Sequence, residues 1–231
     1  MASQTGRTTP RVSRRGLTLA VMATGVAALA ACGSDTVTPP QPQSQVGVPV
    51  DWTLTTADTT KLETGVEGIS THGGTYAAYL HGKTIDASGS IQQRIDAAPF
   101  RGQRVRATAW VTESFLTDAG AFAVGVDAPA SRTQSVVSVP APVGGSDNWH
   151  QVFVVFDVPA NAVGLNVVGS ISGSGQMFFD DIALTPVDTT VSVTTSTRVG
   201  GASDSLSLVA LYAGAHATLL NADFEGGVTG H

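Results

Sequence analysis

The residues of Arg104-Val-Arg-Ala-Thr-Ala-Trp-Val-Thr112 alternate in character with a period of two, and this pattern indicates the class of fold. One set of alternate residues is small and apolar: Val105, Ala107, Ala109 and Val111. The other set is polar or large: Arg104, Arg106, Thr108, Trp110 and Thr112. Successive side chains of a β-strand point to opposite faces, so this pattern predicts a half-buried strand.

Other stretches of the chain suit strands in the same way, and Gly, Pro, Asp and Asn residues separate them. They are Tyr76–His81, Ser90–Asp96, Ala121–Asp127, Gln134–Val139, Trp149–Val158, Val163–Ser170 and Gln176–Leu184. About eight strands at this spacing, with few helical periods, predict an all-β fold, a two-sheet sandwich or jelly roll. Bulky apolar residues on both faces of Trp149–Val158 predict an inner strand there.

The chain from 51 to 188 forms the predicted module, and 189–231 is an extension. Alternating residues from Val191 to Val199 predict a further strand. The range 205–220 suits a short helix capped by Asp204.

The N-terminal region predicts export. Arg14-Arg15 precedes an apolar run that is too short for an ordinary membrane span and ends in Leu29-Ala-Ala-Cys32. The paired arginines resemble a twin-arginine signal, and the last four residues resemble the lipobox of bacterial lipoproteins. Residues 1–31 are thus the predicted signal peptide, and 33–50 the flexible linker.

The lipobox resemblance implies that Cys32 carries a lipid that anchors the protein in the cell-envelope membrane. A plain secretory signal with an incidental cysteine is the alternative. Cys32 is the only cysteine, so a disulfide within the chain is impossible.

The charge of the mature chain excludes some partners. All 18 acidic residues and only eight of the 12 basic residues follow residue 31, so this part carries a formal charge of −10. A nucleic-acid partner requires a basic face, and electrostatic membrane binding requires clustered Lys and Arg. We therefore expect neither.

An ordered set of motifs carries a family resemblance. It comprises Phe100–Val111 (FRGQRVRATAWV), Asn148-Trp149-His150, Val152–Pro159 (VFVVFDVP) and Ser174–Leu184 (SGQMFFDDIAL). In this order and spacing they resemble the galactose-binding-like jelly roll of bacterial carbohydrate-binding modules, from about residue 52 to residue 187. The resemblance implies a β-sandwich that binds a glycan or polysaccharide without catalysis.

The chain ends in Asn221-Ala-Asp-Phe224-Glu225-Gly-Gly, which resembles the N-x-x-F-E start of that family. The expected place for this motif, before Asp51, lacks it. Our hypothesis is a circularly permuted jelly roll in which 221–231 supplies the first strand. The alternatives are a domain swap that makes a homo-oligomer, and a truncated second module.

The same resemblance implies a structural calcium ion held by Glu225 with Asp180 or Asp181, because Ca²⁺ prefers oxygen ligands. The alternative is that these acids only cap turns and accept backbone hydrogen bonds.

A sugar site requires an aromatic platform with amides and charges beside it. The candidates are Trp110 beside Arg104 and Arg106, Gln93 with Arg94 on the preceding strand, and Tyr79 or Tyr76. The alternative is that Trp110 and the tyrosines pack in the core.

The sequence holds no recognisable catalytic motif, such as H-E-x-x-H, G-x-S-x-G or a phosphate-binding loop. Asp180 and Asp181 are adjacent and would point to opposite faces of a strand, so they cannot easily flank one bond. We expect a binding protein rather than an enzyme. A structural or protein-interaction role in the envelope is the alternative.

Overall fold

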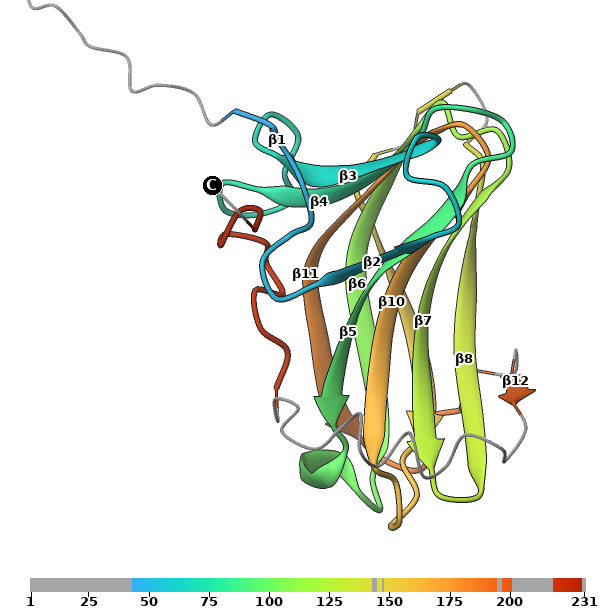
Figure 1. The fold of residues 1–231 in the computed structure, drawn as a ribbon. Coiled ribbons are helices and arrows are strands. Elements are labelled where there is room, and N and C mark those ends of the chain that lie inside the picture. Colours follow the sequence, from blue (N-terminus) through green and yellow to red (C-terminus); the bar gives the residue numbers. More distant parts are fainter. Residues whose placement is uncertain (1–42, 143–144, 147, 195–196, 201–217, 230–231) are drawn as a thin grey trace, which may run out of the picture. The chain divides into compact units, whose positions relative to one another are not determined.

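The computed structural model describes residues 43–142, 145–146, 148–194, 197–200 and 218–229. Their strands form two six-stranded sheets in which every pairing is antiparallel (Figure 1). The strands of sheet I are, in spatial order, β1 (Gln45–Val46), β3 (Leu62–Glu67), β4 (Ala77–Gly82), β11 (Gly175–Val187), β6 (Arg104–Ser114) and β9 (His150–Asp157). Those of sheet II are β12 (Thr197–Gly200), β8 (Ser131–Pro140), β7 (Ala119–Ala128), β10 (Gly164–Ser172), β5 (Ser88–Asp96) and β2 (Thr53–Thr56). A 3-10 turn at Ala98–Phe100 separates β5 from β6.

This architecture confirms the predicted β-sandwich jelly roll, and a strand occurs at each of the eight predicted positions. The three strands before β4 were missed because they are short or lack a regular alternation. In β3, for example, Thr64, Gly65 and Val66 are all buried. Part of the range assigned to the linker also belongs to the fold, because Gln45 and Val46 pair with β3.

The prediction that Trp149–Val158 forms an inner strand is wrong, because β9 is an edge strand of sheet I. Its outward-facing Val155 is nevertheless buried, with 1% of its surface exposed. Residues 188–194 run along the strand, and Thr194 exchanges hydrogen bonds with the backbone of Val155. The second apolar face therefore reflects coverage by an extension rather than a central position in the sheet.

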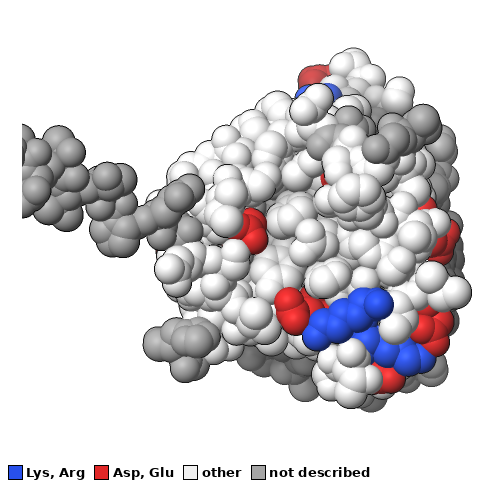
Figure 2. Space-filling view, turned by 90° about the horizontal axis from the view of Figure 1, so that it is seen from above, with Lys and Arg blue, Asp and Glu red and all other residues white. Residues whose placement is uncertain are grey.

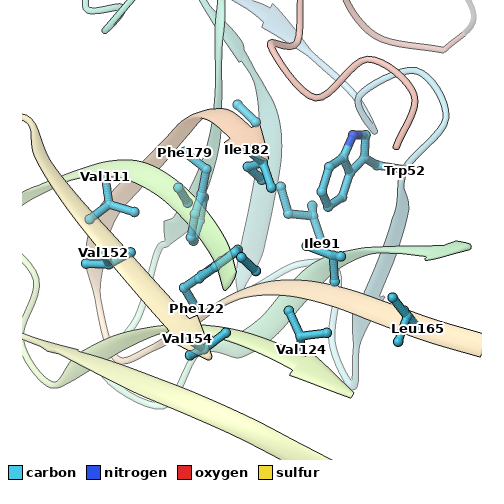
Figure 3. Close-up of a cluster of buried hydrophobic side chains, with 14 of the residues drawn as sticks. Trp52, Ile91, Val111, Phe122, Val124, Val152, Val154, Leu165, Phe179 and Ile182 are labelled. Atoms are coloured by element: carbon cyan, nitrogen blue, oxygen red, sulfur yellow. The ribbon is translucent and has the colours of Figure 1, made fainter. Parts of the chain in front are cut away.

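The core fills the space between the two sheets with side chains from both inner faces. Figure 3 shows Phe122 of sheet II and Phe179 of sheet I among branched aliphatic side chains. Gly169 lies opposite Phe179, and a Cβ atom there would come within 2.7 Å of the Phe179 ring. The close packing of this ring therefore requires a glycine on β10.

The C-terminal segment 218–229 packs against the module of its own chain, alongside β11 and the start of β2 (Figure 1). Phe224 is fully buried, and its ring lies 5.3 Å from the ring of Trp52. The indole N–H of Trp52 donates to the carbonyl of Asn221, and the N–H of Ile182 donates to Ala222. The segment Asn221–Glu225 thus packs into the core of the module, as the permutation hypothesis requires.

The segment does not, however, form the predicted strand. Asn221 and Phe224 have φ angles of 45° and 59°, and Gly227 has a φ of 71°, so the backbone turns repeatedly instead of extending. The segment takes part in β-pairing only through an isolated antiparallel bridge between Val228 and Pro49.

Four predictions fall on residues that the structure does not describe. They are the signal peptide, the lipid on Cys32, most of the linker, and residues 205–217 of the proposed helix. Val191–Thr194 are not in a strand, whereas Thr197–Gly200 form β12. Within the described ranges, no helix has the length and apolar character to cross a membrane.

Phe224→Ala should lower the free energy of unfolding by about 3–5 kcal/mol, because it opens a cavity in the shared core. Chemical denaturation monitored by tryptophan fluorescence measures this change. Asp223→Ala is the matched control, because this neighbouring side chain is exposed and should alter stability by less than about 1 kcal/mol. Equal stability of Phe224→Ala and the wild type would contradict the packing of the segment.

Candidate functional site

A groove crosses the outer face of sheet II, with a volume of about 520 Å³. Its lining residues are small, and about half of them carry hydroxyl groups. They are Thr55, Thr56, Ala57, Ser88, Gly89, Ser90, Ala119, Gly120, Ala121, Ser138, Ser170, Ile171 and Ser172. Residues with short side chains leave space over the sheet, and this space forms the groove.

The register of sheet II aligns the hydroxyl groups across the groove. Thr55, Ser90, Ser170, Ala121 and Ser138 are successive cross-strand partners on β2, β5, β10, β7 and β8. Cross-strand partners share a face, and neighbouring strands lie about 4.8 Å apart. The row therefore places four hydroxyl groups across five strands, a width of about 19 Å.

Amide side chains continue the polar surface beside this row. Gln92 Nε2 donates to Thr55 Oγ1 at 2.9 Å, and Asn166 Nδ2 donates to Gln92 Oε1 at 3.0 Å. The Oδ1 atom of Asn166 is buried and has no hydrogen-bond partner among the described residues. A buried acceptor without a partner costs free energy, so the accessible polar atoms for a ligand are those of the hydroxyl row rather than this oxygen.

Three of the predicted ligand residues make contacts within the fold. Gln93 is buried and binds the backbone of Leu220 and Asp51, so it anchors the C-terminal segment. Arg104 pairs with Asp157 through two hydrogen bonds of 2.7 and 2.9 Å. Tyr79 is buried under the outer surface of sheet I, and burial raises the pKa of its hydroxyl group.

Trp110 and Arg106 lie together on the outer face of sheet I, on the face of β6 that the alternation predicts. The ring of His72 stacks on Trp110 with centroids 3.8 Å apart, and Trp149 meets His72 edge-on at 6.0 Å. Trp110 is therefore a half-buried surface residue, neither a core residue nor an open platform.

The carboxylate of Asp180 is fully buried and holds the loop that precedes β4. Its Oδ2 atom accepts the N–H groups of His72 and Gly73 at 2.9 and 3.1 Å, and its Oδ1 atom accepts the N–H of Asp181 at 2.8 Å. Burial raises the pKa of Asp180 to about 6, although the three amide donors oppose the shift.

The two other predicted calcium ligands contact the same loop. Asp181 Oδ2 lies 2.7 Å from His72 Nδ1, and Glu225 Oε1 accepts the N–H groups of Thr75 and Tyr76. Across the described part of the chain, no three His, Cys, Asp or Glu side chains are placed to hold a metal together. The described carboxylates do not fit a calcium ion as a joint set, and calcium binding stays a prediction.

Asp180→Asn should change how stability depends on pH. Because its pKa is higher in the folded chain than the ordinary aspartate value of 3.8, its stabilising contribution is full below pH about 4 and declines as the pH rises through about 6. The unfolding free energy of the wild type minus that of Asp180→Asn should therefore fall by about 2 kcal/mol between pH 4 and pH 7. Denaturant titrations in the presence of a chelator measure it. Asp223→Asn is the control, and a difference that stays constant or rises with pH would contradict the assignment.

Sequence reasoning missed the amides of the groove, although a signal for them existed. Along β5 the outward residues are Ser90, Gln92 and Arg94, because Ile91, Gln93 and Ile95 are buried. Grouping Gln93 with Arg94 contradicts the period of two, whereas Gln92 with Arg94 obeys it. The hydroxyl row itself required the strand register.

Charge is sparse on the surface. In the view of Figure 2, basic side chains form one larger area and a smaller one at the top edge, each adjoins acidic side chains, and most of the surface is uncharged. Lys61 pairs with Asp86, and Lys83 pairs with Glu63 at 3.0 Å. These pairs neutralise the lysines and do not form a free basic patch for a polyanion.

Comparisons with known proteins give a distant relative and a set of fold neighbours. No protein-family model matches the chain. A stretch of 144 residues, 61% of the chain, is 24% identical to an uncharacterized HTH-type transcriptional regulator, YbfP, of Bacillus subtilis (strain 168). The chain spans about half the length of this curated relative, since the match covers 49% of it.

The solved structures that the chain resembles include carbohydrate-binding modules. One is the CBM22-1–GH10 part of xylanase 10B from Clostridium thermocellum, complexed with xylohexaose. The match has a TM-score of 0.46 and 14% identity, and it covers 66% of this chain and 29% of that chain. Another is a family 16 carbohydrate-binding module, with a TM-score of 0.42, 17% identity, and coverage of 54% and 85%. A third is TmCBM61 in complex with β-1,4-galactotriose, with a TM-score of 0.41, 16% identity, and coverage of 61% and 92%.

Proposed function

We propose that this protein is a non-catalytic binding protein of the cell envelope that holds a glycan or polysaccharide in the groove of sheet II. The observation that carries the proposal is the row of hydroxyl groups across the groove, Thr55, Ser90, Ser170 and Ser138, beside the amides of Gln92 and Asn166. Sugars present a dense set of hydroxyl groups, each both donor and acceptor, and serine, threonine and amide side chains match that chemistry.

The shape and the charge of the groove support an extended, uncharged ligand. The small side chains of Ala119 and Ala121 leave its floor low, and every lining residue is uncharged. A polysaccharide chain could lie across the strands and exchange the water on the hydroxyl row for its own hydroxyl groups. Because such exchange yields little net free energy per hydrogen bond, we expect weak, millimolar to micromolar affinity.

Ala121→Trp should abolish this binding, because an outward-facing indole would occupy the middle of the groove. The measurement is affinity electrophoresis or calorimetry against a panel of neutral polysaccharides, with a drop in affinity of at least about tenfold expected. Asn161→Trp adds the same ring at an exposed turn outside the groove and should retain wild-type binding. Unchanged binding by Ala121→Trp, or a wild-type protein that binds no member of the panel, would contradict the groove as a glycan site.

The proposal places the protein on a membrane through a lipid on Cys32, supported by the lipobox-like Leu29-Ala-Ala-Cys32 and the proline-rich stretch after it. A polar tether of this kind would hold the binding module away from the membrane surface.

Cys32→Ala should move the protein from the membrane fraction to the soluble fraction after export from a bacterial host. Fractionation and mass spectrometry of the mature N-terminus measure the location and the lipid. Ser34→Ala, two residues further on, is the control and should stay in the membrane fraction. A wild-type N-terminus without lipid would reject the anchor and leave the groove proposal intact.

A further inference from the structure

The outer face of sheet I is covered at both ends and open in the middle. At one end, His72 lies over Trp110. At the other end, residues 188–194 run beside β9, and Arg104 Nη1 donates to the carbonyls of Thr189 and Val191. Between these two covers lies a window formed by Arg106 and Thr108 of β6, Gln151 and Phe153 of β9, and Ala183 and Thr185 of β11.

An aromatic ring forms the floor of this window. Phe153 is 50% exposed, although it lies in the middle of a strand whose inward neighbours Val152 and Val154 are buried. Its cross-strand partner is Thr108, and Thr108 in turn faces Ala183, so the side chains next to the ring across the sheet are small. An exposed aromatic ring in a fixed position is a typical contact surface for a flat apolar face.

A guanidinium group lies over one face of the Phe153 ring. The Cζ atom of Arg106 is 5.1 Å from the Phe153 ring centroid, a cation–π contact. The Nε atom of Arg106 is buried and has no hydrogen-bond partner among the described residues. Stacking therefore holds the charge in place and partly dehydrates it.

Arg106 also lacks an ion pair among the side chains that the structure describes. Arg101, Arg104 and Arg132 each have an aspartate within 4.0 Å, whereas Arg106 and Arg94 do not. A chain with an excess of acidic residues usually neutralises its few cations. A guanidinium without an ion pair is favourable to an external carboxylate, which can bind its two terminal nitrogens with two hydrogen bonds.

We propose that this window is a second binding site, specific for a uronic acid residue of an acidic glycan. The sugar ring would stack on Phe153, the carboxylate would bind Arg106, and Gln151 with Thr185 would contact the hydroxyl groups. The charge complementarity of Arg106 and the exposed ring select this ligand over a neutral sugar. The site lies on the sheet opposite the groove, so it does not depend on the groove being a glycan site.

The test is calorimetric titration of the full-length chain with oligomers of galacturonate, glucuronate and mannuronate, and with the same oligomers after reduction of their carboxyl groups. At least one uronate oligomer should bind saturably, and its reduced form should bind at least about tenfold more weakly. The affinity should also fall as the salt concentration rises.

Variants assign the binding to the window. Arg106→Gln and Phe153→Ala should each weaken uronate binding at least about tenfold, whereas Phe153→Tyr should retain it. Phe153 is half exposed, so its replacement should leave the fold intact, and circular dichroism checks this. Arg94→Gln removes an arginine on the outer face of sheet II that has no ion pair among the described side chains, and it should leave uronate affinity unchanged.

The outcomes separate this proposal from the groove. Loss of uronate binding in Arg106→Gln but not in Ala121→Trp supports the window. Loss in Ala121→Trp alone assigns the acidic glycan to the groove and overturns the window. Equal affinity for the uronate and reduced oligomers, or no binding of any uronate oligomer, overturns it as well.

Discussion

Each sheet of this protein buries one face against a shared core, and the rest of the structure depends on this constraint. The alternation along every long strand assigns half of its side chains to the core and half to an outer face. Phe179 and Phe122 pack with their aliphatic neighbours in the shared core, and this packing holds the two sheets together. Two outer faces remain, one on each sheet, and both candidate binding surfaces lie there.

The end of the chain completes the same core. Phe224 packs on Trp52, and Gln93 uses its buried amide to bind the backbone of Leu220. Carboxylates on either side of this junction hold one loop: Asp180 binds the amides of His72 and Gly73, and Glu225 binds those of Thr75 and Tyr76. Two of the acids that a family resemblance assigns to calcium, Asp180 and Glu225, thus accept backbone amides, and calcium binding stays a prediction.

The two outer faces differ in chemistry because different residues occupy their outward positions. Sheet II presents serine, threonine and alanine around its groove, a neutral surface that accommodates hydroxyl groups. Sheet I presents Trp110, Phe153 and Arg106. A loop partly covers Trp110, Phe153 is half exposed, and Arg106 is partly buried over the Phe153 ring. A neutral polysaccharide on one face and an acidic sugar on the other would let one module cross-link two glycan chains.

The eight long strands could be predicted from the sequence, since a period of two is a local property and needs only neighbouring residues. The sequence also placed Trp110 and Arg106 on one face, and Asn221–Glu225 in the module. Only the tertiary structure decided what lies across a strand pair or on top of a sheet. The hydroxyl row needs the register of five strands, the cover on Trp110 needs a loop 38 residues earlier in the chain, and the window beside Phe153 needs the course of residues 188–194. These contacts join residues far apart in sequence, and no local pattern encodes them.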